Sequence, residues 1–204
     1  TVNAISRHLI KKKDSRLIYV GAGTSGRIGM MDGVELIPTF GWPTKRLEFI
    51  IAGGNKAAFK SVENAEDDED ASYDCFKNLN VNKNDIVIGI AASGNTPFTC
   101  NFLKLSHSEK ALTIAISNNP NGKILSFGKF KITLDTGQEV VAGSTRLKAG
   151  TAQKICLNII STMVMTNLGF VRNGLMTNLI PNNKKLADRI KRIRKINKVY
   201  ENRK

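Results

Sequence analysis

The feature that most constrains the fold of this chain is the alternation of short apolar runs with segments of helical periodicity. Each apolar run has the length of a strand, and four of the five are followed by a loop and then by a helical pattern. Strands of a parallel sheet are apolar throughout because helices cover both of its faces. We therefore predict an α/β fold, a doubly wound five-stranded parallel sheet with helices on both faces.

The predicted elements divide the chain into a sheet domain and an extension. Strands are expected at residues 17–20, 47–52, 86–91, 112–117 and 130–134, and helices at residues 25–36, 66–78, 96–106, 146–168 and 184–200. Residues 1–170 form the predicted domain and residues 171–204 a basic helical extension. The extension carries apolar residues at helical spacing, namely Leu186, Ile190, Ile193, Ile196 and Tyr200. This stripe predicts an amphipathic helix packed on the core or on a partner subunit.

Charge and composition exclude several classes of protein. The formal net charge is +14, but residues 184–204 alone carry ten Lys or Arg against two acidic residues. The remainder is only mildly basic, and few aromatic residues accompany the basic run, so nucleic-acid binding is not expected. Every apolar stretch is shorter than the roughly 20 residues of a membrane span. The first residues also lack the apolar core of a signal peptide. We expect a cytoplasmic protein with no membrane contact.

Cysteine and histidine chemistry is not expected either. Cys75, Cys100 and Cys156 lie far apart without a C-x-x-C spacing, which favours reduced structural thiols over a disulfide or a metal site. His8 and His107 are the only histidines, and neither has a Ser, Cys or carboxylate at a spacing typical of a catalytic pair.

Three loops rich in glycine and hydroxyl side chains predict a phosphate site. Two follow predicted strands, at residues 21–26 and 92–97, and the third, at residues 143–148, precedes the longest predicted helix. Ligands of doubly wound sheets bind at the carboxyl ends of strands, where helix N-termini attract phosphate. The residues expected to bind the ligand are Gly23, Thr24, Ser25, Gly26, Arg27, Ser93, Gly94, Asn95, Thr96, Ser144, Thr145 and Lys148. Ordinary helix capping by Ser and Thr is the alternative for any one loop.

Comparison with two nucleotide-binding motifs restricts the kind of phosphate ligand that these loops are expected to bind. Residues 21–26 fit G-x-G-x-x-G, but residues 39–42, where a dinucleotide site would place an acidic residue, are Thr, Phe, Gly and Trp. No loop fits the G-x-x-x-x-G-K-[ST] motif of nucleotide triphosphatases. A compact phosphate monoester is therefore the favoured ligand.

These loops lie in segments that together resemble one family. The resemblance begins with the run RLIYVGAGTSGR at residues 16–27 and continues, in order, through residues 35–41, 51–54, 62–68, 91–97, 143–154 and 183–186. In these segments the chain resembles the N-acetylmuramic acid 6-phosphate etherases, which have the sugar isomerase (SIS) fold, a flavodoxin-like sheet. The resemblance departs at Asn95, where these enzymes usually have Arg, and at residues 176–179.

The resemblance implies a carbon–oxygen lyase. Such an enzyme cleaves the ether between D-lactate and C3 of N-acetylmuramic acid 6-phosphate, giving N-acetylglucosamine 6-phosphate in cell-wall sugar recycling. It implies a cytoplasmic homodimer that needs no metal or organic cofactor. By similarity, Glu35 corresponds to the proton donor and Glu66 to the second catalytic glutamate. One carboxylate can remove the C2 proton of the open-chain sugar, and the other can protonate the departing lactate oxygen.

Two other functions remain open on the same fold. SIS domains also occur in regulators such as the glucokinase regulatory protein, so a non-catalytic sugar-phosphate-binding regulator is the main alternative. An aldose–ketose isomerase is the other. The presence of both Glu35 and Glu66 favours the etherase, because a sensor needs phosphate loops but no paired acid and base. The family's N-terminal segment and C-terminal helical region are not expected within this chain.

Overall fold

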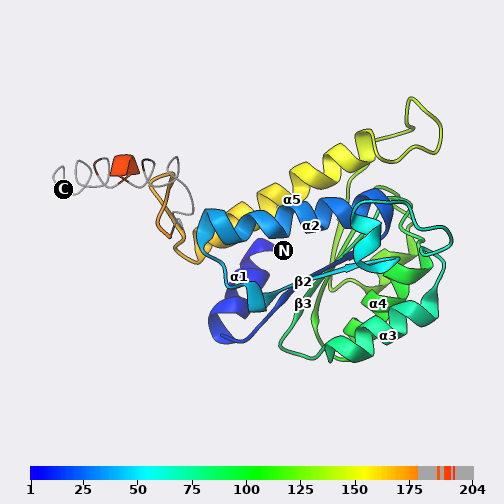
Figure 1. Ribbon diagram of the computed structural model, residues 1–204, viewed down its shortest axis with the longest axis horizontal. Helices are drawn as coiled ribbons and strands as arrows, with labels where there is room; N and C mark the ends of the chain where they lie inside the picture. The colour runs from blue at the N-terminus through cyan, green and yellow to red at the C-terminus, as the bar shows by residue number, and fades with distance from the viewer. Residues whose placement is uncertain (179–187, 189–190, 194, 196–204) are drawn as a thin grey trace.

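The computed structural model describes residues 1–178, residue 188, residues 191–193 and residue 195 (Figure 1). A single sheet organises the domain. Its strands are β1 (Leu17–Gly21), β2 (Leu47–Ile51), β3 (Ile86–Ala91), β4 (Leu112–Ser117) and β5 (Phe130–Thr133). They lie in the order β2-β1-β3-β4-β5, and all neighbouring pairs are parallel. The predicted doubly wound, five-stranded parallel sheet is confirmed.

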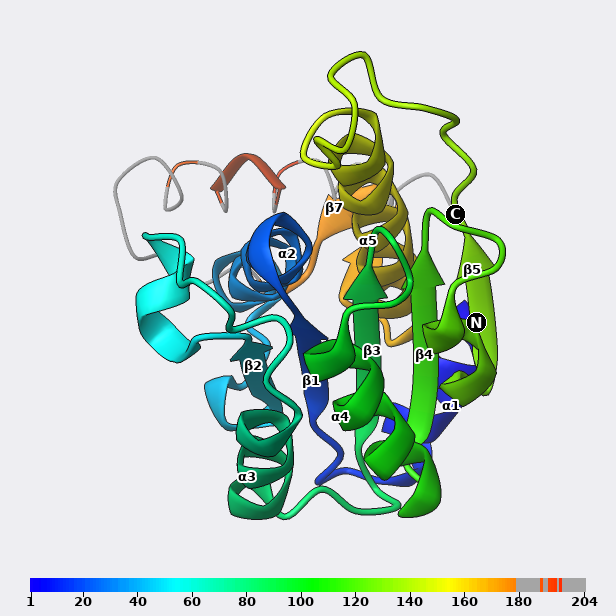
Figure 2. The ribbon, with the colours of Figure 1, turned by 90° about the vertical axis from the view of Figure 1, so that its right-hand side faces the viewer.

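Helices cover both faces of the sheet (Figures 1 and 2). On one face, α5 (Lys148–Asn167) packs between α2 (Gly23–Phe40) and α1 (Val2–Lys11). The other face is covered by α3 (Glu69–Leu79) and α4 (Pro97–Ser108), which contact each other. The remaining elements are the 3-10 helices η1 (Thr44–Arg46), η2 (Gly54–Ala58) and η3 (Lys123–Phe127) and the hairpin of β6 (Val171–Arg172) and β7 (Leu175–Met176).

The core consists of two apolar clusters, one on each face. Ile5 and Leu9 of α1 belong to the cluster under α2 and α5, whereas Phe98 and Phe102 of α4 belong to the other. Strands β1, β3 and β4 are buried throughout. The expectation that all five strands would be buried was wrong for β2 and β5, which are partly exposed and include Glu48 and Lys131. Both are edge strands, so each has a neighbour on one side only.

The helices differ from the prediction mainly at their ends. Helix α2 begins two residues earlier than expected and runs on through Pro38. Helix α3 begins at Glu69, not at residue 66, because the side chain of Asp68 caps it by accepting a hydrogen bond from the Ala71 N–H at 2.8 Å. Glu66 therefore lies in a loop. Helix α1 was not predicted.

The predicted C-terminal helix at 184–200 and most of the predicted extension at 171–204 lie outside the described residues. Of the apolar stripe, Leu186, Ile190, Ile196 and Tyr200 are among the residues that the structure does not describe. Among the helices that it does describe, none has both the length and the apolar character that a membrane crossing requires.

Candidate active site

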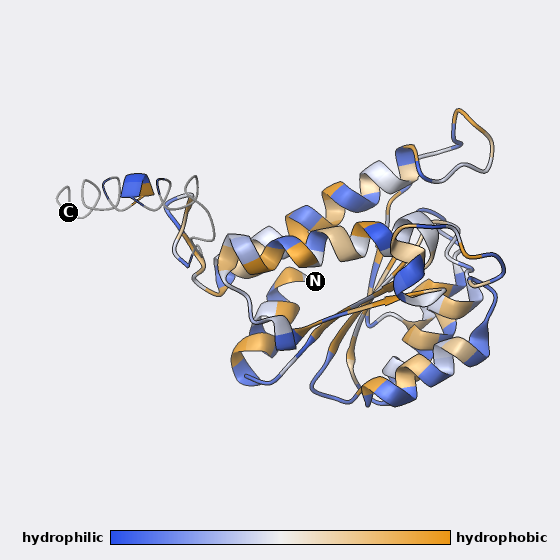
Figure 3. Cartoon of the chain, viewed as in Figure 1, coloured by the Kyte–Doolittle hydropathy of each residue, from blue (hydrophilic) through white to orange (hydrophobic). Residues whose placement is uncertain are grey.

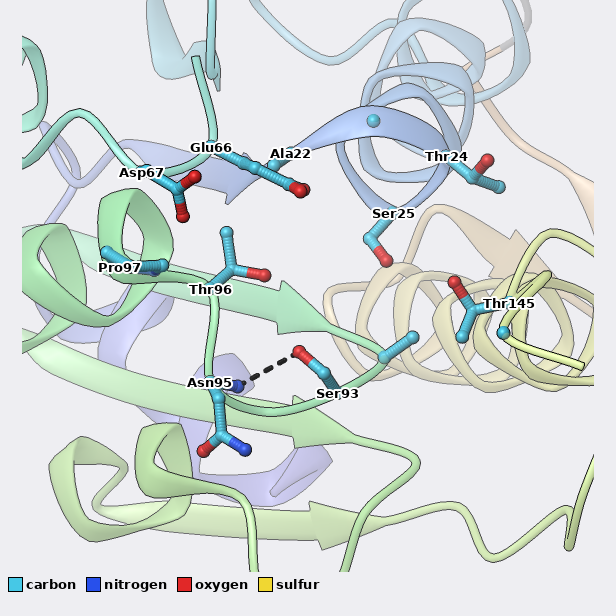
Figure 4. A pocket seen from close by; sticks show the side chains of 13 residues that line it. Ala22, Thr24, Ser25, Glu66, Asp67, Ser93, Asn95, Thr96, Pro97 and Thr145 are labelled. Atoms are coloured by element: carbon cyan, nitrogen blue, oxygen red, sulfur yellow. Dashed lines mark hydrogen bonds between the residues drawn. The ribbon is translucent and has the colours of Figure 1, made fainter. Parts of the chain in front are cut away.

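A cleft of about 440 Å³ opens at the carboxyl edge of the sheet (Figure 4). It lies where the chain leaves β1 for α2 on one face and leaves β3 for α4 on the other, which is the topological switch point of the sheet. Its volume is in the range of small-ligand sites. The lining residues are Ala22, Gly23, Thr24, Ser25, Glu66, Asp67, Ala92, Ser93, Asn95, Thr96, Pro97, Gly143 and Thr145.

The first wall of the cleft is the turn from β1 into α2. Helix α2 starts at Gly23, and among the described residues no side chain caps its first turn. The amides of that turn are therefore available to an anion in the cleft. Ser25 is buried at 7% exposure and brings a hydroxyl to the same place. Gly26 has a packing role instead, since a Cβ there would lie 2.8 Å from the carbonyl oxygen of Gly21.

The second wall is the loop from β3 into α4. Pro97 occupies the first turn of α4, and the Thr96 side chain makes no capping hydrogen bond within the described part of the chain. Pro97 has no N–H and the Phe98 N–H donates to the Glu66 carbonyl oxygen, so this helix terminus offers fewer free amides than that of α2. The Ser93 hydroxyl accepts a hydrogen bond from the Asn95 N–H at 3.1 Å (Figure 4). The Asn95 side-chain oxygen accepts from the Lys123 N–H at 3.0 Å, which holds the loop against η3.

The third hydroxyl cluster contributes less than expected. Thr145 and Gly143 line the cleft, but Ser144 and Lys148 do not. The Glu139 carboxylate accepts hydrogen bonds from the backbone N–H groups of Lys148 at 3.0 Å and Ala149 at 2.9 Å. These bonds, the one from Ala149 first, lower the pKa of Glu139. A carboxylate of the chain itself thus occupies the α5 N-terminus, and sequence reasoning missed it.

One of the two predicted catalytic glutamates lies in the cleft. Glu66 is exposed on its wall, and Figure 4 shows its side chain running toward the first loop near Ala22. The carbonyl oxygen of Glu66 accepts a hydrogen bond from the Phe98 N–H at 3.0 Å, which ties this loop to the first turn of α4. Asp67 also lines the cleft and was not predicted.

The other glutamate is remote from this cleft. Glu35 is exposed on α2, twelve residues after Gly23, which places it about 18 Å along the helix axis from the turn that lines the cleft. The structure therefore does not bring Glu35 and Glu66 together within one chain.

Arg27 does not line the cleft. Its guanidinium donates to the carbonyl oxygens of Ala57 at 2.9 Å and Lys60 at 3.2 Å. It lines a neighbouring hollow of about 260 Å³ that shares Ala22, Gly23 and Glu66 with the cleft. Its contacts show a role in holding η2 against α2. Within the described residues, no group of three or more His, Cys, Asp or Glu side chains is placed to hold a metal ion.

Two family models match the chain. The N-terminal SIS domain of the glucokinase regulatory protein matches residues 1–107, and the SIS domain matches residues 56–168. A curated relative from Bacillus thuringiensis subsp. konkukian (strain 97-27), named N-acetylmuramic acid 6-phosphate etherase, is 50% identical over 182 residues. The match covers 89% of this chain and 62% of the relative, so the chain spans less than two thirds of its length. The resemblance inferred from the motifs is confirmed.

Solved structures with low identity share the fold. The C-terminal domain of glucosamine-fructose-6-phosphate aminotransferase from Francisella tularensis is 17% identical, with a TM-score of 0.57 over 96% of this chain and 46% of that one. The Vibrio vulnificus NanR protein complexed with ManNAc-6P is 12% identical, with a TM-score of 0.55 over 96% of this chain and 59% of that one.

Proposed function

Because this chain belongs to the SIS-domain family, we propose that it is the sugar-phosphate-binding core of an N-acetylmuramic acid 6-phosphate etherase. The observation that carries the proposal is the 50% identity to a curated etherase. The cleft adds physical support, since it combines the uncapped N-terminus of α2 and the first turn of α4 with the exposed carboxylate of Glu66. We place the reaction in the cytoplasm, as the sequence resemblance implies.

The phosphate of the substrate would bind between α2 and α4. Each helix N-terminus carries roughly half a positive charge, so the two together offset about one unit of a phosphate dianion. The hydroxyls of Ser25, Ser93 and Thr96 lie beside these termini and can donate hydrogen bonds to phosphate oxygens. We therefore expect phosphate to dominate recognition of the sugar.

The proposed reaction is an elimination followed by a hydration. With the sugar ring open, the C2 proton is next to the aldehyde, and Glu66 removes it as a general base. The electron pair left at C2 forms the C2–C3 double bond as the C3–O bond to lactate breaks, and Glu35 protonates the departing oxygen. Water then adds across the double bond, with its oxygen at C3, which gives N-acetylglucosamine 6-phosphate. No step needs a redox partner.

Glu35 can take part only if it reaches a cleft other than its own. Exposed apolar residues lie on the two helices that pack together here, namely Ile155, Ile159 and Met163 on α5 and Met31 and Val34 on α2. Figure 3 shows hydrophobic colouring along both helices. We refer to these five side chains as the apolar face. These five side chains are 44–55% exposed, and the three on α5 are spaced by four residues, so they share one side of the helix.

We infer that a second copy of the chain covers this apolar face as a homodimer, and that Glu35 of each copy enters the cleft of the other. A contiguous apolar surface on a folded domain is a common mark of such a contact. The inference also accounts for a catalytic glutamate that lies about 18 Å along α2 from the cleft of its own chain.

Mixing two inactive variants tests this arrangement. Glu35→Gln and Glu66→Gln chains, each inactive alone, are combined, dissociated and reassociated. If Glu35 acts across the dimer, half of the dimers are hybrids and each hybrid has one intact cleft, so about a quarter of the parent lactate release returns. Absence of any recovery, with hybrid dimers demonstrated by native mass spectrometry, would place both glutamates in one chain and refute the shared cleft.

A sugar-phosphate-binding regulator is the second candidate. The match to the N-terminal SIS domain of the glucokinase regulatory protein over residues 1–107 favours it. A regulator would bind N-acetylglucosamine 6-phosphate in the same cleft and release no lactate from the etherase substrate. The two functions are therefore separated by measuring binding and turnover on one preparation.

A further inference from the structure

A second hollow of about 440 Å³ lies at the amino edge of the sheet. Its walls come from the end of α1, the loop before β3, the turn between α4 and β4, and the residue before β5. It shares no residue with the cleft at the carboxyl edge. The lining residues are His8, Lys12, Lys83, His107, Lys110, Ala111, Leu112 and Lys129, so six of the eight are basic.

The lysines of this hollow have no carboxylate partners in the described part of the chain. The ion pairs found there are Arg16 with Asp85 and Lys191 with Asp188, and neither includes a lysine of the hollow. Asp85 lies close enough to act on His8. Both of its oxygens are already engaged by the Arg16 guanidinium, at 2.9 and 2.7 Å. The positive charge of the hollow is therefore not neutralised by these contacts.

Helix ends account for only part of this charge. Helices α1 and α4 end beside the hollow, at Lys11 and Ser108, and a helix C-terminus attracts cations. Two such termini together carry about one negative charge, whereas the four lysines of the hollow carry four positive charges, so most of the positive charge remains. One lysine is fixed in place, since the Lys12 ammonium donates to the Lys83 carbonyl oxygen at 2.6 Å. Lys110 has a φ of 61°, a left-handed conformation that glycine or asparagine adopts more readily.

Each of the two histidines has one ring nitrogen within hydrogen-bonding distance of a described residue and one ring nitrogen that is not. His8 donates from Nε2 to the Asn84 carbonyl oxygen at 2.9 Å, and His107 Nδ1 lies 3.3 Å from the Thr113 hydroxyl. No described residue bonds to the other nitrogen of either ring. The pKa of His8 is lowered, first by burial and further by the charges of Lys12 and Lys129, as expected in a region of positive potential.

We propose that this hollow is an anion site for a compact ligand that carries two or more phosphate groups, such as inorganic pyrophosphate or a small bisphosphate. Its volume suits a small ligand. Four ammonium groups exceed what a single phosphate dianion neutralises. Among the described residues, its apolar lining consists of Ala111 and Leu112, and no Phe, Tyr or Trp side chain lines it. This inference is independent of the etherase reaction.

The histidines provide a probe for this site. The chain has only two, and both line the hollow, so imidazole C–H resonances of the full, tag-free chain report on it alone. Pyrophosphate is titrated by NMR without divalent cations, before and after saturation with N-acetylglucosamine 6-phosphate. We expect both histidines to shift with one saturating dissociation constant that the sugar phosphate leaves unchanged. Unmoved histidine resonances, or displacement of pyrophosphate by the sugar phosphate, would overturn the proposal.

A pair of matched double variants gives the decisive comparison. In Lys83→Gln/Lys129→Gln, two lysines of the hollow are removed, and in the control Lys104→Gln/Lys131→Gln two exposed lysines outside it are removed. A charge contact in water is worth a factor of roughly five. The first variant should therefore bind pyrophosphate more than about tenfold more weakly, and the control should match the parent. Equal losses in both would show attraction to the general charge of the chain and would refute a built site.

Discussion

Replacing Gly94 with alanine tests how closely the loop from β3 into α4 packs against its neighbours. Gly94 has a φ of 71°, and an added Cβ would lie 2.6 Å from the Ser117 hydroxyl oxygen and closer still to the Cα of Gly122. Normal carbon contacts begin near 3.5 Å, so the loop must move by about 1 Å. The left-handed conformation costs about 1–2 kcal/mol and the crowding about 1–3 kcal/mol more. We expect a total loss of about 2–5 kcal/mol in the free energy of unfolding, measured with urea.

Gly54→Ala is the matched control. Gly54 has a φ of 69°, nearly that of Gly94, but a Cβ there meets no atom within 4 Å. It should lose only the conformational part, about 1–2 kcal/mol. Calorimetry on the same proteins should show weaker binding of N-acetylglucosamine 6-phosphate for Gly94→Ala and unchanged binding for Gly54→Ala. Equal stability losses in the two variants would refute the crowding of this loop as the cause.

Two further predictions follow from the carboxylates that the structure singles out. Asp32 is 5% exposed between α2 and α5, where it accepts hydrogen bonds from Tyr19, Asn158 and Ser161. Burial is the main cause of its raised pKa. Its contribution to stability is therefore present below its unfolded pKa of about 3.9 and is lost as pH rises through the folded pKa. Urea denaturation should show Asp32→Asn gaining stability relative to the parent as pH rises from about 4 to 7, whereas a constant difference would count against the raised pKa. Glu139 has a lowered pKa because it accepts the Ala149 and Lys148 N–H bonds, so its support of α5 is lost as pH falls through the folded pKa. Glu139→Gln should accelerate hydrogen exchange at Lys148 and Ala149 at neutral pH, and unchanged exchange would show that the cap is dispensable.

Local patterns were sufficient to predict the sheet and two walls of the cleft. The central strands are continuous apolar runs, and the loops after β1 and β3 meet because parallel strands end at one edge. The partial exposure of β2 and β5 was not predicted. Each is an edge strand with one neighbour, and a charged residue, Glu48 or Lys131, lies within it. Helix α1 was missed because it is short and ends in a run of three lysines. Its buried residues include Ile5 and Leu9, too few to give a clear helical pattern in the sequence.

The remaining features of the site depend on distances that sequence spacing does not give. Glu139 caps α5 from nine residues before Lys148, across a loop whose path has no regular pattern. Arg27 follows the glycine motif directly, yet its side chain turns to the carbonyl oxygens of Ala57 and Lys60. Glu35 is separated from the cleft by more than three turns of helix, about 18 Å. Motif resemblance named Arg27 and Glu35 without showing which residues they meet, and it did not name Glu139.

The measurement that tests the central claim most directly is lactate release from N-acetylmuramic acid 6-phosphate in heavy water, with deuterium at C2 followed by NMR. The proposed function predicts that the purified chain releases D-lactate and incorporates deuterium at C2. Glu66→Gln should lose both, whereas Glu35→Gln should lose about 10² in lactate release and retain exchange at C2. A chain that binds the sugar phosphate yet shows neither exchange nor lactate release would contradict the etherase assignment and leave the regulator.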